Sequence, residues 1–218
     1  PGGLGALPVV IAAVWVFSGP DVTFELRGRW AGGGEVKTVT AGPPGVFTKG
    51  EGERSQDIPG QWPRFLGPGR NALSKDFTAL ADSWPDTGPP VVWGVDLGRG
   101  HAGPAIYEGC AYVLDYHDDS DDAKKGDVLR CLSMKDGRGL WGYWSNVLVK
   151  DVHGMSRTGP AIADDYVITF GPACHTMCVD ALTGEFQWGM SLVGRYKTQI
   201  PRWHASQCPL IDDGRAIF

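Results

Sequence analysis

The sequence lacks the short motifs that mark several common enzyme classes. It contains no G-x-S-x-G, no H-E-x-x-H, no P-loop, and no G-x-G-x-x-G that joins a strand to a helix. No order of Ser, His and Asp residues indicates a hydrolase triad. The sequence therefore identifies no catalytic residue.

Runs of basic residues are also missing. The chain has 20 Lys and Arg against 25 Asp and Glu, a formal net charge of −5, and the basic residues do not cluster. Nucleic acid is therefore excluded as a predicted partner.

Cysteine is scarce. The five cysteines stand at positions 110, 131, 174, 178 and 208, without a CxxC or CxxCH pattern. An odd number cannot all pair within one chain, so cysteine usage leaves the redox compartment open.

No apolar run is long enough to cross a membrane. Residues 1–20 carry no charge and residues 4–17 are almost wholly apolar, but a span needs about 20 residues. Because the chain begins with Pro1, we expect a processed product or a fragment whose upstream sequence completes a signal peptide or membrane anchor. A buried strand or helix is the alternative. Residues 1–19 are thus predicted to be an anchor or signal remnant of a protein of the cell envelope or periplasm.

Glycine and proline are abundant, with 32 and 16 residues, and nine tryptophans accompany them. This composition favours an all-β protein with many turns. Residues 20–60 are rich in Gly and Pro and poorly periodic, which predicts a linker with one short strand at 22–26. Residues 61–218 hold the folded part. Within it, residues 62–68 (Trp-Pro-Arg-Phe-Leu-Gly-Pro) predict a segment laid across a folded surface, and residues 91–93 predict a strand ending in Trp93.

A short hairpin occurs three times. Each copy has a small residue and a proline, at 103–104, 159–160 and 208–209, and then a strand, a two-residue turn and a second strand. The turns are Glu-Gly at 108–109, Asp-Asp at 164–165 and Asp-Gly at 213–214.

A second hairpin follows in two of these copies. Its turns contain Gly137 and Gly184, and Trp93, Trp141 and Trp188 recur at spacings of 48 and 47 residues. Four short strands in each 40–50 residues are typical of a β-propeller blade. We expect the recurring tryptophan to pack against the neighbouring blade. The prediction is a truncated, partial propeller of about three four-stranded antiparallel blades, too short to close a ring.

Asp180, Thr183, Gly184 and Trp188 belong to the sequence Asp-Ala-Leu-Thr-Gly-Glu-Phe-Gln-Trp. This sequence resembles the Asp-Ala-x-Thr-Gly-x-x-x-Trp repeat of quinoprotein (PQQ-type) propellers. Residues 136–141 are similar to a degraded copy without the Thr. Residues 62–70 resemble the lead-in of the bacterial PQQ-binding-like branch. The resemblance covers about residues 62–218.

The resemblance implies two hypotheses, because the repeat occurs in PQQ-dependent alcohol dehydrogenases and in non-enzymatic relatives such as the outer-membrane assembly lipoprotein. The first is an envelope binding or scaffold module for a protein or a small-molecule ligand. The second is a PQQ-dependent alcohol or sugar dehydrogenase, with PQQ and calcium as cofactors and an active site mainly in missing blades. The dehydrogenases use calcium ligands, a catalytic Asp and a disulfide of adjacent cysteines, and this chain has no adjacent cysteine pair and no match to the others.

Two clusters suggest metal ligands. Cys174, Cys178 and Cys208 are candidates for a tetrahedral site with His204, while packed core cysteines, or a disulfide from Cys208 to Cys174 or Cys178, are the alternatives. The acidic insert, residues 117–127, offers oxygen atoms that suit calcium. It has Ala and Leu where an EF-type loop needs Gly and Glu, so we predict a solvated loop.

Basic and aromatic residues also occur in the loops that enter the predicted inner strands. Such loops line one mouth of a propeller channel, where ligands bind. The candidate rim for an anionic or planar ligand consists of Arg157, Lys197, Arg202, Trp203 and His204. Ordinary polar loops with a packing tryptophan are the alternative.

Overall fold

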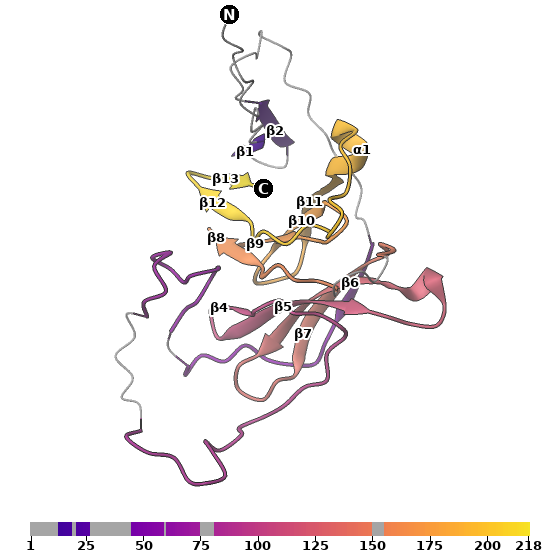
Figure 1. Ribbon diagram of the computed structural model, residues 1–218. Helices are drawn as coiled ribbons and strands as arrows, with labels where there is room; N and C mark the ends of the chain where they lie inside the picture. Colours follow the sequence, from indigo (N-terminus) through magenta and orange to yellow (C-terminus); the bar gives the residue numbers. More distant parts are fainter. Residues whose placement is uncertain (1–12, 19–20, 27–44, 59, 75–80, 150–154) are drawn as a thin grey trace, which may run out of the picture.

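The computed structural model describes residues 13–18, 21–26, 45–58, 60–74, 81–149 and 155–218. Almost all regular structure in these ranges is strand, arranged in three antiparallel sheets that lie one above another (Figure 1). The predictions for residues 1–12, 19–20 and 27–44 lie outside the described residues. No helix in the described ranges is long and apolar enough to cross a membrane. An all-β fold of antiparallel sheets is confirmed.

The first and second sheets each contain four strands that are consecutive in sequence and in space. In the first sheet the order is β3-β7-β6-β5-β4, so β3 is added at one edge, and in the second it is β11-β10-β9-β8. The strands of the first sheet are β3 (Gly45–Lys49), β4 (Ala105–Tyr107), β5 (Cys110–His117), β6 (Gly126–Ser133) and β7 (Gly139–Ser145). Those of the second are β8 (Ala161–Ala163), β9 (Tyr166–Phe170), β10 (His175–Asp180) and β11 (Phe186–Ser191).

The third sheet combines strands from both ends of the chain. Its order is β12-β13-β1-β2, with β1 at Ala13–Ser18, β2 at Asp21–Leu26, β12 at Leu210–Asp212 and β13 at Arg215–Ile217. The predicted strand near residue 22 is therefore present. Helical structure in the described residues amounts to η1 (Asp122–Lys124) and α1 (Leu192–Tyr196).

The three inner hairpins have the predicted two-residue turns. Both turn residues have positive φ in every copy: 46° and 68° at 108–109, 48° and 62° at 164–165, and 47° and 67° at 213–214. Two successive positive φ angles define the turn whose twist matches that of the flanking strands. The first turn joins β4 to β5, the second joins β8 to β9, and the third joins β12 to β13.

The Asp-Ala-Leu-Thr-Gly sequence forms a self-contained turn between β10 and β11. Oδ1 of Asp180 accepts hydrogen bonds from the backbone N–H groups of Leu182 (2.9 Å) and Thr183 (2.7 Å) and from the Thr183 hydroxyl (2.9 Å). Gly184 then takes φ 75°. The Asp, the Thr and the Gly are thus explained by one local network.

Two of the three recurring tryptophans lie on turn glycines, whereas Trp188 packs in the core shared by the second and third sheets. A Cβ added to Gly184 would lie 2.7 Å from the Trp141 ring, and one added to Gly137 would lie 2.7 Å from the Trp93 ring. Trp141 belongs to the first sheet and Gly184 to the second, so the predicted packing of a tryptophan against the neighbouring unit is confirmed for this pair. Only a residue without a side chain permits the approach.

The sheets bury their faces against each other. One core cluster joins Leu129 and Trp141 of the first sheet to Val167 and Val179 of the second. A second cluster joins Ile168 and other residues of the second sheet to β12 and β13. The second sheet is therefore the middle layer of the stack.

Two predictions need correction. Residues 91–93 form no strand, because no described segment pairs with them; Val91 and Val92 are 86% and 83% exposed. Trp93 is held instead by its position over Gly137 and by the hydrogen bond from its indole N–H to the Met134 carbonyl, 2.9 Å.

Strand β3 lies inside the range predicted as a linker. All five of its residues pair with β7, and the rings of Phe47 and Tyr143 lie 6.4 Å apart. The Gly- and Pro-rich composition around this strand hides it, since its partner is about 95 residues away and no local pattern reports such a pairing.

The tryptophan–glycine contact can be separated from backbone strain by two substitutions. Alanine at either Gly184 or Gly214 meets a positive φ, 75° or 67°, and a strain of about 1–2 kcal/mol. Nothing lies within 4 Å of the new Cβ at Gly214, whereas the rings of Phe47 and Trp141, both in the first sheet, are each 2.7 Å away at Gly184. We expect Gly184→Ala to lose about 1–3 kcal/mol more than Gly214→Ala in urea unfolding. Equal losses would show that Trp141 does not constrain the turn.

Candidate functional site

Residues 62–70, which we call the crossing segment, contact one edge strand of each sheet, namely β4, β8 and β12 (Figure 1). Trp62 exchanges two backbone hydrogen bonds with Ile106 of β4, at 2.8 and 2.9 Å, and the carbonyl of Pro63 accepts one from Ile162 of β8 at 2.8 Å. The side chain of Arg64 donates to the Ile162 carbonyl at 3.0 Å. The guanidinium of Arg70 donates to the carbonyl of Ile211 in β12. The predicted segment across a folded surface is confirmed.

A cleft of about 620 Å³ opens between the crossing segment and the residues that lead into β4, β8 and β12. We call it the inner cleft. Its walls include the Pro of each repeated hairpin, so the three proline positions found in the sequence meet at one place. The lining residues are Trp62, Arg64, Phe65, Leu66, Arg70, His101, Gly103, Pro104, Arg157, Gly159, Pro160, Ser206, Gln207, Cys208, Pro209 and Leu210.

The charge of the inner cleft is positive. Arg64, Arg70 and Arg157 line it, whereas none of its described lining residues is Asp or Glu. At the edge of the cleft, Arg70 forms an ion pair with the exposed carboxylate of Asp212 at 3.8 Å. Such a surface in a chain of net charge −5 favours an anionic ligand.

The arginines retain hydrogen-bonding capacity. The Nε atoms of Arg64 and Arg157 are buried and have no hydrogen-bond partner. Burial and the neighbouring charge of Arg70 lower the pKa of Arg64 from its ordinary value. An anion placed between these guanidinium groups would offset the repulsion between Arg64 and Arg70 and would accept hydrogen bonds from both groups.

Of the five predicted rim residues, the structure places only Arg157 in the lining of the inner cleft. Its guanidinium donates to the Trp203 carbonyl, and the Arg202 guanidinium lies 4.8 Å from the centre of the Trp203 ring. Lys197 ends helix α1 in a left-handed conformation, and the backbone N–H of His204 donates to the Pro201 carbonyl at 2.8 Å. These residues form a neighbouring loop that supports Arg157.

Arg64, Arg70 and His101 also line the inner cleft, and no motif in the sequence predicts this role for them. Arg64 and Arg70 belong to residues 62–70, whose resemblance to a propeller lead-in predicts the fold and not a binding site. Their role depends on the path of the crossing segment over three sheets, which no local pattern reports.

The candidate metal ligands do not come together. Cys174 packs with Phe170 and Ala205, Cys178 lies in the core between the second and third sheets, and Cys208 lines the inner cleft. All five cysteines are free thiols. No group of three or more His, Cys, Asp or Glu residues is placed to hold a metal in the described ranges.

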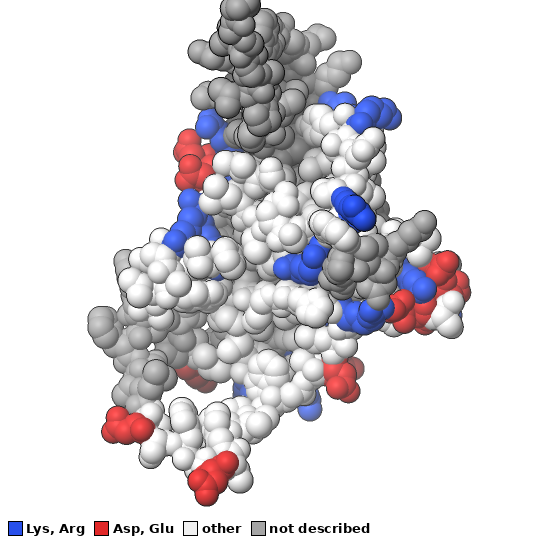
Figure 2. Space-filling model, viewed as in Figure 1, with Lys and Arg blue, Asp and Glu red and all other residues white. Residues whose placement is uncertain are grey.

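The acidic insert forms a charge-balanced loop. Asp118 lies 2.8 Å from Arg99 and 3.4 Å from Lys125, and Asp122 lies 3.0 Å from Lys125. The hydrogen bond from Arg99 lowers the pKa of Asp118. Figure 2 shows acidic and basic side chains gathered on the projection that carries η1 in Figure 1.

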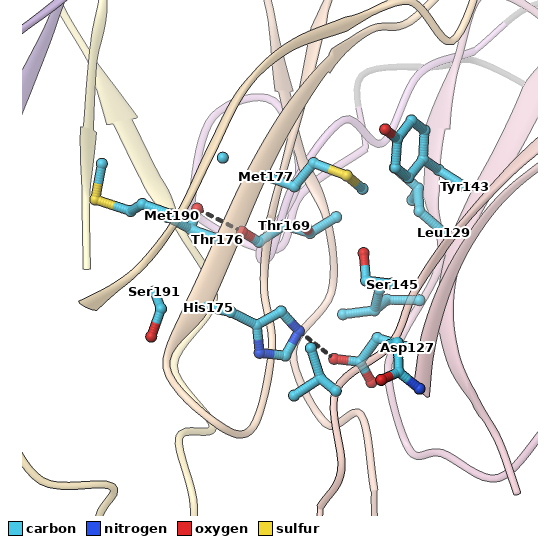
Figure 3. A pocket seen from close by; sticks show the side chains of 14 residues that line it. Asp127, Leu129, Tyr143, Ser145, Thr169, His175, Thr176, Met177, Met190 and Ser191 are labelled. Carbon is cyan, nitrogen blue, oxygen red and sulfur yellow. Dashed lines mark hydrogen bonds and ion pairs between the residues drawn. The ribbon is translucent and has the colours of Figure 1, made fainter. Parts of the chain in front are cut away.

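A smaller pocket, about 240 Å³, lies between the first and second sheets. In Figure 3, Asp127, Tyr143 and Ser145 face His175 and Met177 across it. Nε2 of His175 in β10 lies 2.7 Å from Oδ2 of Asp127 in β6, and the Ser156 hydroxyl donates to the other carboxylate oxygen at 2.5 Å. We call these three residues the inter-sheet polar cluster, since it joins the two sheets.

The inter-sheet polar cluster was not foreseen. In the sequence Asp127 ends the acidic insert and His175 lies between two cysteines, and Gly171 is the one residue whose type hints at their contact. A Cβ on Gly171 would lie 2.0 Å from the His175 ring, so a glycine is required for the ring to reach Asp127.

No protein-family model matches the chain, and no curated protein matches it.

Loss of the inter-sheet polar cluster is expected to destabilise the protein strongly. Asp127→Ala leaves His175 and Ser156 without their common partner at a site where the Asp127 side chain is 3% exposed. Removing one member of a buried pair costs about 3–5 kcal/mol. The free energy of unfolding, measured in urea, checks this value.

Asp119→Ala is the matched control for that substitution. Asp119 lies in the exposed insert and its carboxylate is 3.6 Å from His117, so we expect no measurable change in stability. Similar losses from the two substitutions would contradict a structural role for the inter-sheet polar cluster.

Proposed function

We propose that the chain is a non-catalytic binding module of the cell envelope, and that its inner cleft takes an anionic group of a small ligand or of a partner protein. The carrying observation is the set of three arginines, with no described carboxylate, in a concave site of about 620 Å³. Clefts of this size suit small molecules. Two guanidinium Nε atoms in the wall of the inner cleft, those of Arg64 and Arg157, are buried without a hydrogen-bond partner.

A partial propeller of the quinoprotein type is the fold that we propose for this module. Its support is the recurrence of the inner hairpin in all three sheets and of the outer turn in two. The Asp180–Thr183–Gly184 network and the contact between Trp141 and Gly184 give the resemblance of the repeat a physical basis. In a propeller, the innermost strands surround the channel, which agrees with the position of the inner cleft beside β4, β8 and β12.

A PQQ-dependent dehydrogenase is the second candidate. The guanidinium groups and the Trp62 ring of the inner cleft suit a planar molecule with carboxylates. Calcium does not fit the donor set, because no described lining residue supplies a carboxylate. For this candidate, PQQ with Ca²⁺ would raise the melting temperature of the complete protein and support dye reduction with alcohols, and the binding module would give no dye reduction.

The envelope location is proposed from the apolar composition of residues 4–17, of which residues 13–17 form part of strand β1 and pair with β2. Fractionation of the native host would place the protein in the envelope. Recovery with cytoplasmic markers would reject this location and leave the ligand proposal intact.

Arg64→Gln should weaken anion binding. We use citrate and inorganic phosphate as probes, at constant ionic strength, and follow the melting temperature of the protein as the probe is added. A hydrogen bond from a charged group contributes about 1.5–3 kcal/mol, so the variant should bind about 10- to 100-fold more weakly.

Arg138→Gln is the control, because the Arg138 side chain is 74% exposed and lies outside the inner cleft. It should bind the probe as the unchanged chain does. Binding that is absent in the unchanged chain, or equally affected by both substitutions, would overturn the proposed function.

A further inference from the structure

The pocket between the first and second sheets, which we call the inter-sheet pocket, differs from the inner cleft, and the two share no lining residue. Its volume is about 240 Å³. One wall comes from β5, β6 and β7, and the other from β9, β10 and β11. Most of its surface is apolar, and the apolar lining residues are Leu114, Leu129, Tyr143, Val147, Met177 and Met190.

Two buried hydroxyl groups of β7 line the inter-sheet pocket without a partner. Tyr143 and Ser145 are 3% and 4% exposed, and neither hydroxyl forms a hydrogen bond with a described residue. Alternate residues of a strand share a face, and both side chains lie on the face toward the second sheet (Figure 3). Burial raises the pKa of Tyr143, so its hydroxyl keeps its proton and can donate. A ligand in the pocket can therefore bond to these hydroxyls.

The charges at the inter-sheet pocket do not favour an ionic ligand. Asp127 is the one carboxylate among the described lining residues, and its two oxygens already face Ser156 and His175. None of the described lining residues is Lys or Arg, so an anion would meet the Asp127 carboxylate without a permanent cation. An ammonium group would lose its hydration for a carboxylate that is already paired. The pocket therefore suits an uncharged molecule.

The size and walls of the inter-sheet pocket suit a single aromatic ring. An apolar protein cavity of about 150 Å³ can take benzene, so a volume of about 240 Å³ admits one ring with a small substituent. Met177 faces Tyr143 across the pocket (Figure 3), and thioether sulfurs make favourable contacts with aromatic rings. Asn146 and Ser191 are lining residues exposed to solvent, so the pocket opens to the surface where β7 and β11 end.

We infer that the inter-sheet pocket binds an uncharged aromatic alcohol of one ring, that is, a phenol. The ring lies between Leu129 and Met177, which belong to opposite sheets, and the hydroxyl bonds to Tyr143 or Ser145. Water is a poorer occupant, because it needs two to four polar partners and most of this surface is apolar. This site is independent of the anion site proposed for the inner cleft.

The test uses phenol and toluene, which differ in the hydroxyl, as probes in isothermal titration calorimetry of the full 218-residue chain. We expect phenol to bind saturably, with one molecule per chain. The double variant Tyr143→Phe, Ser145→Ala removes both hydroxyls and keeps the volume of the side chains nearly unchanged. Loss of a hydrogen bond between neutral groups should weaken phenol binding about 2- to 10-fold. Toluene should bind the variant at least as tightly as it binds the unchanged chain.

Tyr107→Phe is the matched control, since it removes a hydroxyl that bonds to Asp165 at 2.6 Å at an exposed site outside the inter-sheet pocket. It should leave phenol binding unchanged. Absence of saturable binding would show that the pocket holds water only and would overturn the inference. Equal weakening of phenol and toluene in the double variant, or no weakening of phenol, would also overturn it. Saturating phenol should not alter the binding of citrate, so failure here does not bear on the inner cleft.

Discussion

The Trp141 ring of the first sheet packs directly on the α-carbon of Gly184, and this contact limits the distance between the first and second sheets. The shared core of these sheets fills the space behind this contact, with Leu129, Val167 and Val179 among its fully buried members. A wider separation would leave voids in that core, and interiors tolerate few voids. The reach of His175 to Asp127 and of Arg54 to Ala181 depends on the same spacing.

Stacking of the sheets also produces the inner cleft. The short inner strands β4, β8 and β12 come from three different sheets, and the crossing segment binds an atom of each. Because Arg64 and Arg70 use side-chain N–H groups for carbonyls of β8 and β12, their guanidinium groups are fixed beside each other. Two like charges held in this way are the feature on which the proposed anion binding depends.

Local chemistry made much of the fold predictable. The hairpin turns at 108–109, 164–165 and 213–214 need residues that tolerate positive φ. All their residues except Glu108 are Gly or Asp, so the turns can be predicted from the sequence. Of the non-local contacts, the recurrence of tryptophan predicted the packing of Trp141 against the second sheet, but most others were not predictable. Strand β3 is recognised only through β7, and the inter-sheet polar cluster brings together residues 127, 156 and 175 from separate segments. Residues 91–93 show the converse error, in which strand propensity is present and a partner is not.

The third sheet has a consequence for the time course of folding. Val14 of β1 pairs with Ile217 of β13, so this sheet closes a loop of about 200 residues, while each inner hairpin closes with a two-residue turn. The entropic cost of closing such a long loop precedes the favourable contacts of the pairing, so pairings of this kind form slowly. The hairpins therefore form first, and β1 can pair with β13 only after β13 has left the ribosome. Until then the edge of β13 is open, and another polypeptide can add a strand to it.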